Sequence, residues 1–196
     1  MTSQIRVSGI IFSLLMATQA FALDPVAVSK AAELTCHRIE RLVTLKKIDA
    51  SFQDKLYSIQ IVKLKPATPT DPVFKAIALQ IPGADGTFKK VEIMMDASGK
   101  GLTQNVIPGT EGTTVVWPAK DPVSLMENSL HWVLENGLTK AEIKPYYDNV
   151  SEIVLTQGKD ADGKILAKVT FKISESPKLL EVILKDDGTF VSGKVL

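Results

Sequence analysis

A stretch of twelve residues occurs twice in the chain, and it constrains the fold more than any other feature of the sequence. Residues 91–102 have the pattern of a strand that runs into a tight polar turn, and residues 180–191 match them without a gap at an offset of 89. Gly99 and Gly188 occupy the same place in the two copies. Glycine at the end of a short polar turn is typical of a positive φ, which costs this residue no steric strain. The repeat predicts a duplicated strand and turn.

The segments that precede the two copies also occur in the same order in each half of the chain. Asp24-Pro25 and Asp121-Pro122 each precede a stretch with helical spacing of apolar residues, at 26–47 and 123–136. Alternating segments follow at 57–64, 74–81 and 88–95 in the first half, and at 152–156, 165–173 and 179–185 in the second. The turns between them are short, which favours antiparallel pairing. We therefore predict an α+β fold of two tandem αβββ units, with antiparallel meander sheets that each carry a helix on one face.

This pattern predicts the organisation of the chain into units. The first unit covers residues 23–104, a linker rich in proline and glycine covers 105–119, and the second unit covers 120–196. Pairing of the edge strands of the two units would hide exposed sheet edges.

The first 22 residues have the three parts of a secretory signal peptide. Arg6 supplies the positive charge, residues 7–17 form a short apolar run, and Ala20-Phe21-Ala22 is a small-residue cleavage site. We expect cleavage after Ala22 and a periplasmic or secreted protein. No later segment has the length and apolar character of a membrane span.

The charge balance limits the kinds of partner, and the cysteine content limits the redox chemistry, that we expect for this chain. Arg6 is the only charged residue before the expected cleavage point, so the remaining chain has equal numbers of basic and acidic side chains. A balanced charge without a basic patch argues against a nucleic-acid partner. Cys36 is the only cysteine and lies at helical spacing with apolar residues, so we expect a buried, unreactive thiol.

The helix, the strands and the ending Val-Glu-Ile-Met-Met-Asp-x-x-Gly-Lys of residues 91–100 resemble the PepSY module of secreted bacterial proteins and protease propeptides. The second copy departs from this ending, because Lys185 stands in place of the aspartate. The outline is also similar to the β-lactamase inhibitory proteins and to BamE-like modules. The resemblance implies binding to, or inhibition of, another exported protein such as a peptidase, and it transfers no functional residue.

No catalytic motif is recognisable in the sequence. His131 lies between Glu127 and Glu135 at i, i+4 spacings, which is typical of a solvated helix face, and Cys36 and His37 point apart on a helix. Residues 160–163 resemble the start of a calcium loop, but Phe171 stands where an EF-hand needs glutamate. We expect no enzyme activity, no catalytic residues, no metal ligands and no cofactor, although a site made of carboxylates alone stays open.

The expected function is therefore a non-catalytic binding or inhibitory module that acts on another envelope or secreted protein. The alternative is a periplasmic carrier of a small ligand, with a pocket between the two units. Trp117, Tyr146 and Tyr147 are the candidate binding residues, because large aromatic side chains bury much area at small entropic cost. For each of them, packing in the core is the competing interpretation.

Overall fold

The computed structural model describes residues 24–174 and 176–196, and the expected signal peptide lies outside these ranges. The helices are α1 (Val28–Thr44), α2 (Ala50–Asp54), α3 (Pro122–Gly137) and α4 (Lys144–Asn149). The strands are β1 (Leu56–Lys63), β2 (Phe74–Gln80), β3 (Lys90–Met95), β4 (Gly101–Ile107), β5 (Val150–Lys159), β6 (Ile165–Ile173), β7 (Leu179–Lys185) and β8 (Phe190–Val195). None of the helices within the described ranges combines the length and the apolar character that a membrane crossing needs.

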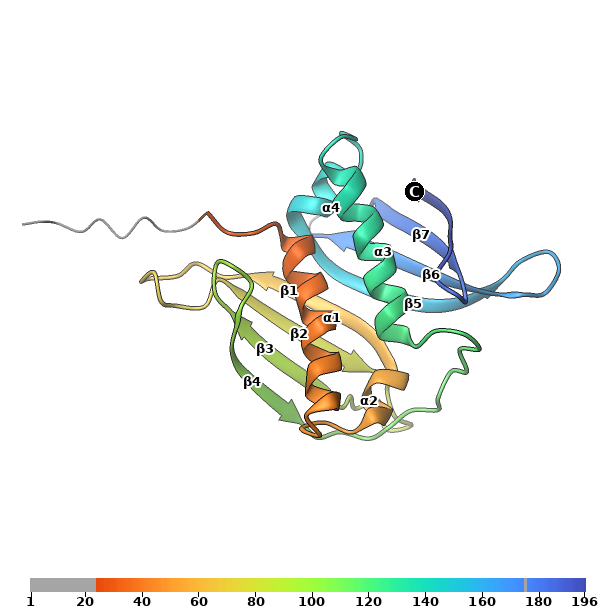
Figure 1. Cartoon of the computed structure of the whole chain (residues 1–196), viewed down its shortest axis with the longest axis horizontal. Coiled ribbons are helices and arrows are strands. Elements are labelled where there is room, and N and C mark those ends of the chain that lie inside the picture. Colours follow the sequence, from red (N-terminus) through yellow and green to blue (C-terminus); the bar gives the residue numbers. More distant parts are fainter. Residues whose placement is uncertain (1–23, 175) are drawn as a thin grey trace, which may run out of the picture.

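All eight strands pair into one antiparallel sheet, in the order β4-β3-β2-β1-β5-β6-β7-β8 (Figure 1). The predicted fold class, α+β with two tandem αβββ units whose antiparallel meander sheets each carry a helix on one face, is wrong, because the chain forms one eight-stranded sheet with four strands from each half. The first strand of each half pairs with the other, Ile59 opposite Ile153, so the halves share one sheet. Each half also adds a fourth strand after its glycine turn, and the helices are a minor part of the fold.

The helices lie on one face of this sheet, where they cover the core. Figure 1 shows α1 over the strands of the first half and α3 over those of the second, with the two helices side by side. The strand residues beneath α1 alternate between buried and partly buried, as in β2 and β3. One cluster of buried apolar side chains runs through both halves. The sheet thus has a single continuous core.

The two repeated turns meet the helices in the same way. Gly99 and Gly188 both have positive φ, 79° and 84°, which confirms the conformation that the repeat predicted. A Cβ atom on Gly99 would lie 2.4 Å from Leu34 of α1, and one on Gly188 would lie 2.1 Å from Asn128 of α3. The backbone conformation therefore favours glycine at each turn, and a side chain of the overlying helix packs closely against it.

Side chains from the helices also hold the two edge strands. Arg38 of α1 donates from Nε to Oε1 of Gln104 on β4, at 3.0 Å. Trp132 of α3 stacks on Phe190 of β8, with ring centroids 5.3 Å apart, and lies so close to Gly193 that a Cβ there would meet its ring at 2.5 Å. An aromatic ring over a strand glycine covers backbone that lacks a side chain of its own.

A single core makes a specific prediction about unfolding. Leu130→Ala removes a fully buried side chain of α3 and should cost about 2–5 kcal/mol of unfolding free energy. Leu138→Ala, just beyond α3 and 70% exposed, is the matched control and should change it by less than about 0.5 kcal/mol. Urea unfolding gives both values. Hydrogen exchange at β2 and β3 should also accelerate in the first variant, and acceleration confined to residues 122–196 would contradict a shared core.

Candidate functional site

Two glutamate–histidine pairs connect α1 to α3 across the surface of the helix layer. Glu33 and His37 lie one turn apart on α1, and Glu127 and His131 lie one turn apart on α3. The contacts are crossed, because Glu33 meets His131 and His37 meets Glu127. Crossed contacts of this kind follow from helices that run antiparallel, as Figure 1 shows for α1 and α3. The same two residue types thus meet twice at one helix interface.

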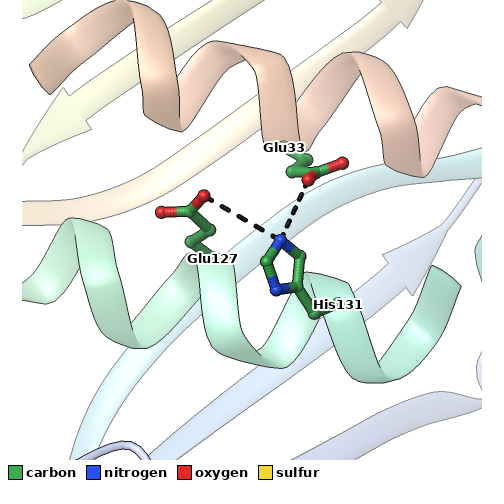
Figure 2. A group of neighbouring side chains, drawn as sticks. All are labelled: Glu33, Glu127 and His131. Carbon is green, nitrogen blue, oxygen red and sulfur yellow. Dashed lines mark hydrogen bonds and ion pairs between the residues drawn. The ribbon is translucent and has the colours of Figure 1, made fainter. Parts of the chain in front are cut away.

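Three of these side chains converge on one point (Figure 2). Nε2 of His131 lies 2.9 Å from Oε1 of Glu33 and 3.9 Å from Oε1 of Glu127. The other oxygen of Glu33, Oε2, pairs with Nζ of Lys30. The side chain of Glu33 is only 5% exposed, whereas that of His131 is 50% exposed. The group is therefore anchored at a buried carboxylate and open to solvent at the imidazole.

The charges of this group shift the titration of its carboxylates. Burial raises the pKa of Glu33, but hydrogen bonds and charge attraction from Lys30 and His131 outweigh burial and hold the pKa below its ordinary value. The pKa of Glu40, one turn after Cys36 and His37, is raised by burial and by the negative charge of Glu127. The helix interface thus concentrates negative charge.

Cys36 lies beneath this surface and is fully buried, as the sequence predicted. Burial raises the pKa of its thiol well above the ordinary value, and the carboxylates of Glu127, Glu40 and Glu33 add to the effect. A thiol that stays protonated is a poor nucleophile and a poor metal ligand. Cys36 therefore has a packing role within the helix layer.

A second candidate site lies where the two central strands separate. β1 and β5 pair only from Ser58 to Gln60, opposite Val154 to Glu152. Beyond Gln60 a cavity of about 640 Å³ opens between them. Its lining combines strand residues of both halves with the first residue of α1, the last residue of α4 and the residue after β6: Val28, Gln60, Ile61, Val62, Lys63, Asn149, Val150, Ser151, Glu152, Ile173 and Ser174. We call this cavity the seam cleft.

The three aromatic residues that the sequence singled out lie in different surroundings. Trp117 lines a cavity of about 210 Å³ with Leu56, Tyr57 and Leu155, where β1 and β5 separate on the other side of their paired residues. Tyr146 is 2% exposed and belongs to the core, as the packing interpretation expected. Tyr147 is partly buried against that core, close to Gly137 at the end of α3. In the part of the chain that the structure describes, neither tyrosine lines the cavity of Trp117.

The sequence analysis did not identify the crossed glutamate–histidine pairs or the seam cleft. Each pair joins residues 90 or 98 positions apart, so only the packing of α1 on α3 brings them together. The sequence held one indication of these pairs, because a glutamate is followed four residues later by a histidine both at Glu33 and His37 and at Glu127 and His131. A repeated glutamate and histidine on the exposed side of two predicted helices indicates a shared surface if the helices pack together.

Comparisons of the chain with models of protein families, with curated proteins and with solved structures found no match. The resemblance to PepSY modules stays a prediction, as do the division at residues 23–104, 105–119 and 120–196 and the cleavage after Ala22. β4 extends through residues 105–107 at the start of the predicted linker. Function is therefore argued from the geometry of this chain alone.

The lowered pKa of Glu33 predicts how stability depends on pH. A carboxylate whose pKa is depressed by folding stabilises the protein at pH values above its ordinary pKa of about 4.5, and this contribution is lost as the pH falls through the depressed value. Glu33→Gln should therefore lower the unfolding free energy at pH 7, and the difference from the wild type should shrink toward pH 3. Urea unfolding at several pH values measures it.

Glu135→Gln is the matched control for this series. It makes the same change on the exposed side of α3, one turn beyond His131, and should leave the pH profile unchanged. A wild-type advantage over Glu33→Gln that stays constant down to pH 3 would contradict the role of the Glu33 carboxylate.

Proposed function

We propose that this chain is an exported, non-catalytic binding protein that captures an extended segment of another envelope or secreted protein. The observation that carries the proposal is the seam cleft, which separates two strands in the middle of a sheet. If the captured protein is a peptidase, occupation of the cleft makes the chain an inhibitor. Export rests on the signal peptide predicted for residues 1–22, and the non-catalytic role rests on the lack of a recognisable catalytic motif in the sequence.

The backbone of the cleft favours an extended peptide as the ligand. Residues 61–63 of β1 pair with β2 along one edge only, and their other edge faces the cleft. Val150 of β5 likewise pairs with β6, next to an irregularity at Ser151. Strand edges of this kind bind extended segments through main-chain hydrogen bonds, and neighbouring pockets select side chains. Two facing edges offer such hydrogen bonds from both sides.

The side chains of the cleft match the alternation of a bound strand. Ile61 is buried, whereas Val62 is 47% exposed and points to the opposite face. Lys63 and Glu152 add one charge of each sign to the lining. The volume of about 640 Å³ falls within the range of ligand sites, roughly 300–1,000 Å³. A segment with alternating apolar and polar residues fits this lining best.

The alternative is a carrier of a small ligand at the cavity of Trp117. In favour of this function, the lining includes Tyr57, Leu56 and Leu155. Gln157, which also lines the cavity, donates from Nε2 to the carbonyl of Val116 at 2.8 Å and so joins β5 to the segment before α3. The volume of about 210 Å³ is smaller than most ligand sites, which lie at roughly 300 Å³ or more. A ligand at this cavity would change the fluorescence of Trp117, and it would leave the seam cleft unaffected.

Val62→Glu tests the peptide-binding function. The substitution puts a charge on an exposed side chain of the cleft, so it should leave the fold intact and weaken peptide binding at least about tenfold, since an unpaired charge at an apolar contact is costly. The probe is a peptide selected from a random library displayed on phage, using the wild-type chain as bait. Isothermal titration calorimetry gives the dissociation constants.

Val106→Glu on the edge strand β4 is the matched control, because Val106 is 45% exposed and lies at a distance from the cleft along the sheet. The selected peptides should bind this variant as they bind the wild type, and they should slow hydrogen exchange at residues 61–63 and 150–151. Equal weakening in both variants, or protection only at β4 or β8, would place binding elsewhere and overturn the proposal.

A further inference from the structure

The side chains between α1 and α3 bring three potential metal-ligand atoms close together. Oε1 of Glu33, Oε1 of Glu127 and Nε2 of His131 all lie within 4.8 Å of one another. Two ligand atoms on one tetrahedral zinc ion, with bonds near 2.1 Å, are about 3.4 Å apart. The observed separations from His131, 2.9 Å and 3.9 Å, lie on either side of this value. Small side-chain rotations therefore bring all three atoms to one ion.

We propose that Glu33, Glu127 and His131 bind a divalent transition-metal ion, with zinc as its representative, between α1 and α3. One imidazole nitrogen and two carboxylate oxygens form a ligand set that zinc accepts, and three protein ligands leave the remaining position to water or to a further donor. Figure 2 shows the imidazole of His131 between the two helices, and this side chain is 50% exposed to solvent.

The surrounding contacts hold these ligands in place. Lys30 occupies Oε2 of Glu33 and leaves Oε1 directed at His131. His37 contacts Oε1 of Glu127 from the opposite helix, and such outer partners orient ligating carboxylates. His37 is itself 46% exposed. The two outer partners come from α1, while two of the three ligands come from α3.

The local charge also favours a cation. Glu33 and Glu127 carry two negative charges, Lys30 compensates one of them, and Glu40 adds a further carboxyl group nearby. A metal ion binds the unprotonated imidazole nitrogen of histidine, so in the bound state the two carboxylates outnumber the single ammonium of Lys30. Because zinc joins one helix to the other, binding would stabilise the helix layer that covers the core.

His131→Ala tests the site by removing its only nitrogen ligand. Zinc should bind the wild-type chain, stripped of metal with a chelator, at one ion per chain, and the variant should bind it at least about 100-fold more weakly. Isothermal titration calorimetry with zinc chloride gives both values. His37→Ala, which removes an outer partner, should weaken binding by about tenfold. Glu135→Gln, on the exposed side of α3, is the control and should bind as the wild type does.

Two further measurements separate a metal site from a loss of structure. Circular dichroism of each metal-free variant shows whether the helices form, and Glu127→Gln replaces His131→Ala if that variant does not fold. Cobalt in place of zinc should give visible absorption bands with the wild type that disappear with the ligand variant. A wild-type chain that binds no zinc, or equal binding by the wild type and both ligand variants, would overturn the proposal and leave the group as an ion pair only.

Discussion

The pairing of β1 with β5 is the contact on which the rest of the structure depends. It spans three residue pairs, yet it joins two sets of four strands into one sheet. Ile59 and Ile153 lie opposite each other there and are fully buried under the helices. Burial of two such side chains contributes about 1.5–3 kcal/mol each. Without this pairing each half would expose an inner strand edge, which is a template for aggregation.

The short length of this pairing also accounts for both cavities. The strands separate on either side of it, toward the seam cleft at one end and toward Trp117 at the other. A longer pairing would close the sheet and leave no cleft between the halves. The helices span the junction above, so the opening of the strands does not expose the core. A cleft in the middle of a sheet is compatible with a stable fold for this reason.

The helix pair above the junction is held by charge as well as by apolar contact. A buried carboxylate such as Glu33 is costly unless it is paired and hydrogen-bonded, and Lys30 and His131 supply both. This requirement explains why lysine and histidine meet Glu33 at a helix interface. The same requirement creates a group of side chains that suits a cation, so the packing of two helices and the proposed zinc site have one physical origin.

Much of the local structure could be predicted from the sequence. Residues 165–173 and 179–185 form strands with the predicted bounds, because apolar residues recur at every second position in both and are buried in the core. β4 and β8 were missed, since edge strands with two partly exposed faces do not alternate in this way. The polar segment at 139–149 contains α4, which is stabilised by packing on α1 and α3 and not by its own pattern.

By itself, the sequence determined the helices α1 and α3, most strands and the two glycine turns, because periodicity and glycine act over a few residues. Only the tertiary structure decided which edges of the two halves join, that β1 and β5 pair over three residues, and that Glu33 meets His131. These contacts join residues more than 90 positions apart. No local pattern specifies them, because they depend on which faces and edges remain to be buried once the local elements have formed.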